Sequence, residues 1–192
     1  MTTPTPLLEP AEPPAFEIVN ARGKGSAVLV CDHASNRVPR RMHELGLNSQ
    51  QLADHIAWDP GAADVARALS ALLDAPLVLS GYSRLVIDCN RPLQSRESIA
   101  EQSAGVPVPG NRYLSAQDRE RRIATFFQPY PIDDAFDYTI PVHGEGRGLA
   151  SAMIEIRQNE IRSAATAAAW ATRLAHAFQA SEAEALVSSP VN

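Results

Sequence analysis

Three short polar clusters in this sequence carry side chains that could bind a metal ion and hold an anionic substrate. Each cluster follows or ends an apolar run of strand length: Asp32-His33, Asp88-Cys89-Asn90-Arg91, and Glu155-Ile156-Arg157. In an α/β sheet, ligands bind beyond the carboxyl ends of the parallel strands. We therefore expect the three clusters to lie together at one edge of a sheet.

The first cluster places an imidazole beside carboxylates. His33 closely follows the apolar run 27–31, and its ring nitrogens suit a divalent metal ion such as zinc. The alternative is that His33 caps a turn through hydrogen bonds. The segment 55–59 adds another histidine and Asp59 just before a helical pattern, where Asp59 also fits a helix N-cap. The residue types alone leave both alternatives open.

The second cluster places two arginines around a short apolar run. Arg84 precedes residues 85–87 and Arg91 follows them, and a guanidinium at a strand end can bind a substrate carboxylate through two parallel hydrogen bonds. The alternative is a structural pair between Arg91 and Asp88, because a buried arginine is seldom left unpaired. Asn90 beside Arg91 favours substrate recognition.

The third cluster places a carboxylate at the end of an apolar run. Burying Glu155 is costly unless it is paired or functional, and beside a metal ion it could accept a proton from water. Its alternative role is an ion pair with Arg157 or Arg84. The nearby glycines match neither a dinucleotide-binding nor a P-loop pattern, so a flavodoxin-like nucleotide binder is disfavoured.

The elements that must position these clusters alternate between strands and helices. Continuous apolar runs predict strands, and helical spacing predicts helices. The predicted strands are 27–31, 76–80, 85–88 and 152–156, and the predicted helices are 59–74, 115–127 and 161–178. This alternation predicts an α/β fold with a mostly parallel sheet and helices on both faces. The Gly- and Pro-rich stretch 94–113 is expected to form a functional loop or lid.

Length and composition limit the domain organisation and the class of partner. The chain has 192 residues, of which 45% are hydrophobic and 20% charged, as in a globular protein. We expect a flexible leader over 1–22, a single domain over 23–180 and a weakly ordered tail over 181–192. A net charge of -5 argues against nucleic acid, and no apolar run suits a membrane span. Two cysteines without a disulfide pattern favour the cytoplasm.

Six motifs in this order resemble the N-formylglutamate amidohydrolase family over about residues 28–178. They are VCDHASNRVP, HIAWDPGA, GYSRLVIDCNRP, VPGNRYLS, YTIPVHGEGRGL and IEIRQNEI. The resemblance implies a carboxypeptidase-like three-layer α/β sandwich that uses a divalent metal, zinc in this group. It also implies hydrolysis of N-formyl-L-glutamate, or of a similar small anionic N-acyl amino acid, in histidine breakdown.

The resemblance also implies roles for the three clusters. His33 corresponds to the first metal ligand, the Asn90-Arg91 pair to the group that holds the substrate carboxylate, and Glu155 to the general base. We add Arg84 as a catalytic arginine and Arg157 as a further substrate contact.

One metal ligand of the wider group is replaced in this chain. Asn36 stands where the group has a glutamate, and a neutral amide is a poor zinc ligand. Asp59 or Asp32 could substitute for it. We therefore assign His33, Asn36 and Asp59 to the metal.

The chain is shorter than the family pattern near Tyr130. Longer members carry an extra stretch there that supplies another metal ligand, for which His143 is the plausible replacement in this sequence. Loss of a central strand exposes sheet edges, which promotes aggregation or forces re-pairing into a smaller sheet or a homo-oligomer. The alternatives are a naturally shortened homologue and a chain from which a segment was removed. The alternative function is a noncatalytic carboxylate-binding module that has lost its metal chemistry.

Overall fold

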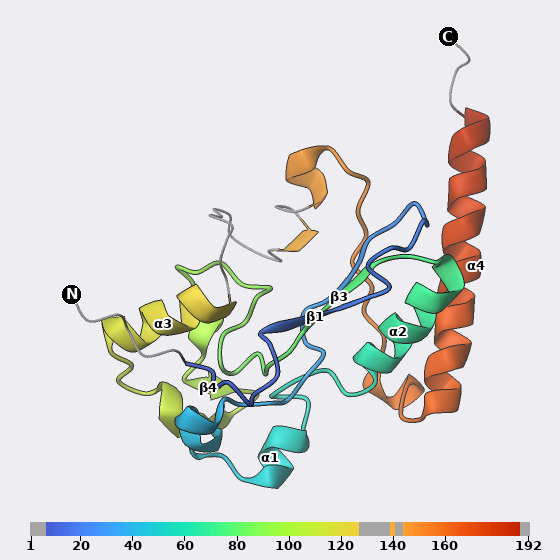
Figure 1. Ribbon diagram of the computed structural model, residues 1–192. Coiled ribbons are helices and arrows are strands. Elements are labelled where there is room, and N and C mark those ends of the chain that lie inside the picture. Colours follow the sequence, from blue (N-terminus) through green and yellow to red (C-terminus); the bar gives the residue numbers. More distant parts are fainter. Residues whose placement is uncertain (1–6, 127–138, 141–143, 189–192) are drawn as a thin grey trace. The chain divides into compact units, whose positions relative to one another are not determined.

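The structure is a computed structural model that describes residues 7–126, 139–140 and 144–188 (Figure 1). Helices and short strands follow one another along the chain, which gives a mixed α/β fold with small sheets. In chain order the elements are β1 (Phe16–Val19), β2 (Leu29–Cys31), η1 (Arg40–Gly46), α1 (Ser49–Ala53), α2 (Ala62–Leu73), β3 (Leu77–Ser80), η2 (Arg96–Ile99), β4 (Gln102–Ser103), β5 (Val106–Pro107), η3 (Pro109–Asn111), α3 (Ala116–Phe126), η5 (Glu145–Arg147), η6 (Gln158–Glu160) and α4 (Ala164–Ser188).

The chain forms two compact units, each built from three separated stretches. Unit 1 consists of Met1–Glu17, Asp32–Pro60 and Leu79–Glu155. Unit 2 consists of Ile18–Cys31, Gly61–Val78 and Ile156–Asn192. The single domain over 23–180 stays a prediction.

Unit 2 is built around the packing of α2 on α4 (Figure 1). Helical spacing places Val65 and Leu69 on one face of α2, and the small side chains of α4 let the two helices approach closely. The buried core comprises Val65, Leu69, Ile161, Ala167, Ala171 and Ala175. Gly61 begins α2 at φ +89°, and a Cβ there would lie 2.4 Å from the Ile161 carbonyl oxygen. Only glycine suits that position.

Unit 1 has its own core, whose buried residues lie in turns, loops and short 3-10 helices rather than in strands. Its buried members are Leu45, Leu47, Ile56, Ala57, Leu85, Val86, Ile87, Ile99 and Val108. The buried polar side chains of this unit include those of Asn111 and Arg122. Arg122 of α3 donates to the Val86 carbonyl and to Asn111 Oδ1, at 2.8 and 2.7 Å. Asn111 in turn donates to the Leu85 carbonyl at 2.9 Å. These bonds fix the turn that contains Leu85 and Val86.

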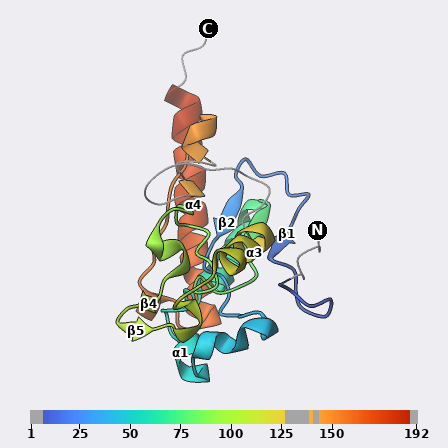
Figure 2. The ribbon, with the colours of Figure 1, turned by 90° about the vertical axis from the view of Figure 1, so that its left-hand side faces the viewer.

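The structure does not confirm the predicted large parallel sheet of a three-layer sandwich. The described residues form a three-stranded sheet in the order β1-β3-β2. They also form an antiparallel hairpin of β4 and β5 (Figure 2). Gln102 pairs with Pro107 in that hairpin, which lies within the stretch expected to form a loop or lid.

Two of the four predicted strands form and two do not. Strands β2 and β3 fall within the predicted 27–31 and 76–80, and the three predicted helices appear as α2, α3 and α4. Residues 85–88 are instead a buried turn, because apolarity marks burial and not strand geometry. Residues 152–156 form no strand and are mostly exposed. Of the predicted strand-end clusters, Asp32-His33 follows a strand, β2, whereas the clusters at 88–91 and 155–157 lie outside strands.

The structure also orders parts of both expected terminal segments. Within the predicted leader, β1 is a strand, the Ala15 carbonyl accepts from Gly81 N at 2.8 Å and the Pro13 carbonyl accepts from Tyr82 Oη at 2.7 Å. At the other end, α4 continues to Ser188. Among the described residues, no helix is both long enough and apolar enough to cross a bilayer.

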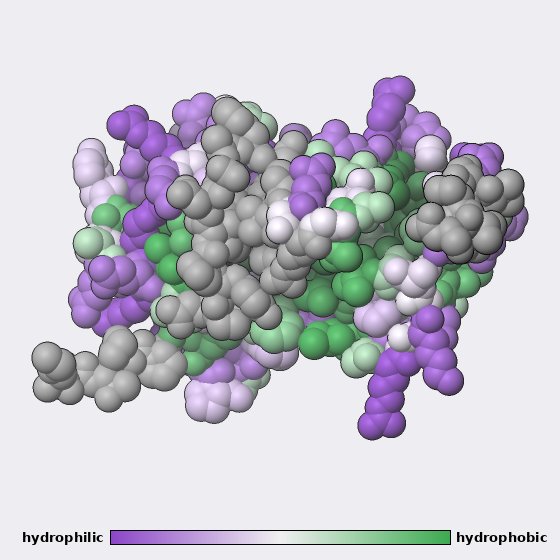
Figure 3. Space-filling model, turned by 90° about the horizontal axis from the view of Figure 1, so that it is seen from above, coloured by the Kyte–Doolittle hydropathy of each residue, from purple (hydrophilic) through white to green (hydrophobic). Residues whose placement is uncertain are grey.

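Several large apolar side chains remain exposed in the described part of the chain. Hydrophobic surface is visible from above in Figure 3, and the exposed residues include Phe16, Ile18, Val28, Val30, Met153 and Ile154. The homo-oligomer stays a prediction that light scattering can test.

Candidate active site

The His33 ring lies between two carboxylates in unit 1. Nε2 is 2.8 Å from Asp88 Oδ1, and Nδ1 is 3.2 Å from Asp59 Oδ2. The side chains of His33 and Asp88 are 11% and 5% exposed, whereas that of Asp59 is 50% exposed. The backbone strengthens this arrangement, because Asp59 N donates to the His33 carbonyl at 3.0 Å. His33 and Asp59, both candidate metal ligands from the sequence, are thus neighbours.

Arg84 completes this group of charges. Its Nη2 donates to Asp88 Oδ2 at 2.9 Å, and its Nη1 lies 3.6 Å from Asp59 Oδ1. Asp88 also accepts from Asn90 N at 2.9 Å. A buried carboxylate is costly without such partners. We call His33, Asp59, Arg84 and Asp88 the His33 cluster.

The charges of the cluster shift the pKa values of its buried members. Burial opposes the charge on His33, but hydrogen bonds to Asp59 and Asp88 outweigh it and raise the pKa of His33 to about 9. Burial acts to raise the pKa of Asp88, yet His33 and Arg84 hold that pKa below its ordinary value. At neutral pH and without a bound metal, His33 is therefore a cation between two carboxylates.

A turn, not a strand, presents Arg84 and Asp88. Ser83 is buried and donates through Oγ to the Ala57 carbonyl at 2.7 Å, while Val86 N donates to the Ser83 carbonyl at 2.9 Å. Asp88 N donates to the Ser98 carbonyl at 2.7 Å. The partners of this turn are distant in sequence, so local pattern could not reveal it.

Asn90 and Arg91 follow Asp88 along the chain, and the described contacts of their side chains are with residues outside the His33 cluster. Arg91 Nε lies 3.3 Å from Glu97 Oε2, and its Nη1 donates to the Asn90 carbonyl at 2.8 Å. Asn90 Oδ1 accepts from Thr139 N at 3.1 Å. Because the Asp88 carboxylate binds Arg84 and His33, it is not the structural partner of Arg91 that the sequence offered as an alternative.

Thr139 is a residue that sequence reasoning missed. Its Oγ1 donates to Asp32 Oδ2 at 2.8 Å, and its backbone contacts Asn90. It therefore bridges the first two predicted clusters. Thr139 lies within the motif YTIPVHGEGRGL, but a threonine in a motif carries no signal for this role.

The donor set fits part of a metal site. His33 Nδ1 and Asp59 Oδ2 are 3.2 Å apart, close to the roughly 3.3 Å between two ligands of a tetrahedral zinc ion. Asn36 donates through Nδ2 to the Leu52 carbonyl at 3.0 Å. The described residues contain no group of three or more His, Cys, Asp or Glu side chains that could hold a metal. His143 lies outside the described residues.

The structure does not join the third predicted cluster to the first two. Glu155 is exposed and, within the described part of the chain, forms no hydrogen bond or ion pair. The ion pair with Arg84, one of its sequence alternatives, is not formed because Arg84 binds Asp88 and Asp59. Arg157 is exposed and belongs to unit 2.

Comparison with known proteins places this site in a family. The model of the N-formylglutamate amidohydrolase family matches residues 25–135, more than half of the chain. The chain therefore belongs to the N-formylglutamate amidohydrolase family. The matched region includes the His33 cluster with Asn90 and Arg91, and it ends before Glu155.

A solved structure supports the fold over nearly the whole chain. The gene product Atu2144 from Agrobacterium tumefaciens superposes with a TM-score of 0.86 at 28% sequence identity, covering 93% of this chain and 97% of that one. The two chains are thus similar in length, and neither carries a long insertion relative to the other. A comparison with curated proteins found no match.

Proposed function

We propose that this protein is a metal-dependent amidohydrolase that cleaves the formyl amide of N-formyl-L-glutamate or of a similar N-acyl amino acid. The observation that carries the proposal is the buried His33 held by Asp59 and Asp88 inside the family-matched region. With N-formyl-L-glutamate, the products are formate and glutamate.

The proposed metal is a divalent ion, zinc by the preference of its ligands. Asp88 fixes the His33 ring through Nε2, as carboxylates commonly do for metal-binding histidines, and leaves Nδ1 for the ion. Asp59 supplies a second ligand, and a third comes from outside the described residues, where His143 lies. When bound, the ion would polarise the amide carbonyl and acidify water.

The chain's own residues then bind the substrate and move its protons. Arg91 and Asn90 bind the substrate carboxylate, with Arg157 as a further contact, and Arg84 orients Asp88 and Asp59. Glu155 is the proposed general base. Its side chain is exposed in the structure.

Metal analysis combined with a formate-release assay tests the proposal. We expect the purified protein to hold about one divalent ion per chain and to release formate from N-formyl-L-glutamate. His33→Gln should lose the ion and reduce kcat/KM by about 100-fold or more. His55→Gln is the matched control, because His55 is exposed and pairs only with neighbouring Asp54 among the described residues. Full turnover by the His33→Gln variant would refute the assignment.

A second variant tests the proposed general base, Glu155, separately from the metal site. Glu155→Gln should lower kcat by about 10²–10⁴-fold with the ion retained, as expected for loss of a general base. Unchanged turnover would show that Glu155 is not the general base, and it would not contradict the proposed metal site.

The second candidate is a noncatalytic module that binds carboxylates. It is favoured by the complete pairing of the His33 ring and by the lack of a three-donor group among the described residues. This function would give a protein without stoichiometric metal or formate release that binds glutamate saturably. Arg91→Ala should abolish that binding.

A further inference from the structure

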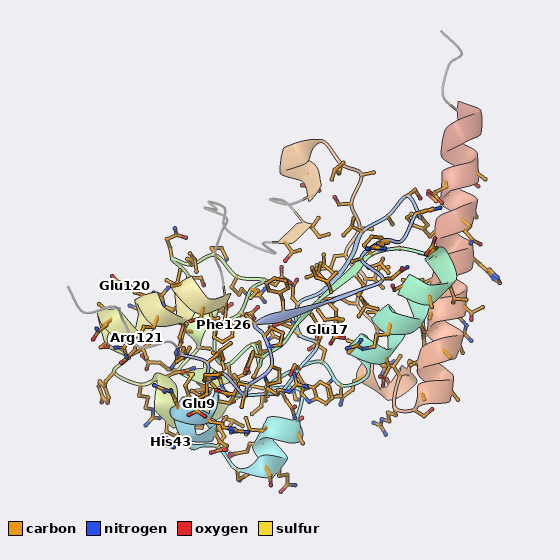
Figure 4. All side chains as sticks on the ribbon, in the orientation of Figure 1. Glu9, Glu17, His43, Glu120, Arg121 and Phe126 are labelled. Atoms are coloured by element: carbon orange, nitrogen blue, oxygen red, sulfur yellow. The ribbon has the colours of Figure 1, made fainter. Side chains whose placement is uncertain are left out.

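A cavity of about 270 Å³ lies in unit 1, and none of its lining residues belongs to the His33 cluster. Three arginines, Arg41 of η1 with Arg121 and Arg122 of α3, contribute to its wall, against a single carboxylate, Asp118. Figure 4 labels Arg121 on α3 and Glu9 on the N-terminal segment. We call this cavity the Arg121 pocket.

Arg121 has an unmet hydrogen-bond donor in this pocket. Its Nε is buried and has no hydrogen-bond partner in the described part of the chain. Its Nη1 lies 3.5 Å from Asp118 Oδ1, a long contact, and Asp118 Oδ2 already accepts from Ser115 Oγ at 2.7 Å. A buried donor without a partner costs about 1–3 kcal/mol. Because the Nε is covered by protein atoms, an acceptor in the pocket reaches it only when the Arg121 side chain turns toward the ligand.

The other two arginines differ in what they can offer a ligand. Arg122 donates to the Val86 and Gly110 carbonyls and to Asn111, so it contributes positive charge from a fixed position. Arg41 Nε lies 3.7 Å from Glu9 Oε1, beyond normal hydrogen-bond distance, and Arg41 is still able to donate. The pocket thus combines excess positive charge with the vacant Nε of Arg121.

The rest of the lining is apolar and limits the kind of anion. Leu7, Met42, Leu45 and Leu114 line the same cavity, and they favour an aliphatic body over a compact inorganic ion.

We infer that the Arg121 pocket binds a small organic acid, with its carboxylate on Arg121 and Arg41 and its aliphatic chain against the leucines and Met42. The site is separate from the proposed active site and does not depend on the proposed function. It gives the protein a second anion-binding position on the same unit.

Calorimetric titration with hexanoate tests this inference on the whole chain. We expect saturable binding to the unmodified protein and weaker binding of acetate, which lacks the aliphatic body. Arg121→Met should weaken hexanoate binding by about 10–100-fold, as expected for loss of a hydrogen bond to a charged group. Arg112→Met is the matched control, because Arg112 is exposed and does not line the pocket.

Two further measurements separate this pocket from the proposed active site. Arg91→Ala should leave hexanoate affinity unchanged, and the Nε–H resonance of Arg121 should shift on titration. The inference is overturned if Arg91→Ala abolishes binding while Arg121→Met does not. It is also overturned if inorganic phosphate binds as tightly as hexanoate, or if hexanoate does not bind at all.

Discussion

The His33 cluster and the Arg121 pocket lie on the same unit and differ in whether their buried polar atoms have hydrogen-bond partners. In the cluster, both nitrogens of the buried His33 ring face a carboxylate, and Arg84 binds the buried Asp88. In the pocket, a buried guanidinium nitrogen has no acceptor among the described residues. The hydrogen bonds of the His33 cluster fix the positions of its side chains, whereas the Arg121 pocket can be stabilised by a bound ligand.

The largest expected effect comes from the residue beside Arg121. Arg122→Met should lower the free energy of unfolding by about 3–5 kcal/mol, because Asn111, the buried Val86 carbonyl and the Gly110 carbonyl lose a charged donor. Urea unfolding of the variant and the parent protein measures this loss. A loss below about 1 kcal/mol would show that the turn carrying Arg84 and Asp88 does not depend on Arg122.

The second prediction concerns the pH dependence of the metal-free His33 cluster. The folded-state pKa of about 9 exceeds the ordinary 6.5, so the stabilisation is fully present below pH 6.5 and is lost as the pH rises through 9. We expect the free energy of unfolding to fall by about 3 kcal/mol across that interval. Chelator-treated protein unfolded by urea at several pH values provides the measurement.

The control for this pH series is His33→Gln, which should show no such decline. A zinc-loaded sample should also lose the dependence, because a metal-bound imidazole is neutral. Identical pH profiles for the parent and His33→Gln proteins would contradict a cationic His33 held by two carboxylates.

The smallest expected effect is at Arg121 itself. Arg121→Met should leave the free energy of unfolding unchanged or raise it by about 1 kcal/mol, because it removes a buried donor without a partner and only a long contact to Asp118. Thermal unfolding without added anions measures the change. A marked loss of stability would mean that the Nε is satisfied in solution, which would erase the contrast between the two sites.

The sequence was informative where local periodicity decides structure. The helical spacing of Val65 and Leu69 predicts α2, and the apolar runs 27–31 and 76–80 predict β2 and β3. It failed at 85–88, where the backbone conformation is set by Ser98, Asn111 and Arg122, which are far along the chain. An apolar run indicates that its residues are buried, and contacts with residues distant in sequence decide that its backbone forms a turn.

The candidate site was predictable in its members more than in its contacts. Residue type suggested His33 and Asp59, and the structure brings them together. The cluster that contains Asp88 was expected to lie at the same edge as His33, but the only contact considered for Asp88 was a pair with Arg91, because spacing does not show which side chain it reaches. Thr139 was missed for the same reason. The roles of Glu155 and Arg157 depend on a family resemblance and await the variants described above.

The interleaving of the two units also constrains the order in which the chain can fold during synthesis. The apolar face of α2 is covered by Ile161 and by alanines of α4, which emerge from the ribosome only after residues 70–160 have followed Leu69. Val65 and Leu69 therefore stay uncovered while that intervening segment is made. A nonsense codon anywhere before Ile161 would release a product whose second core can never close, and which is prone to aggregate.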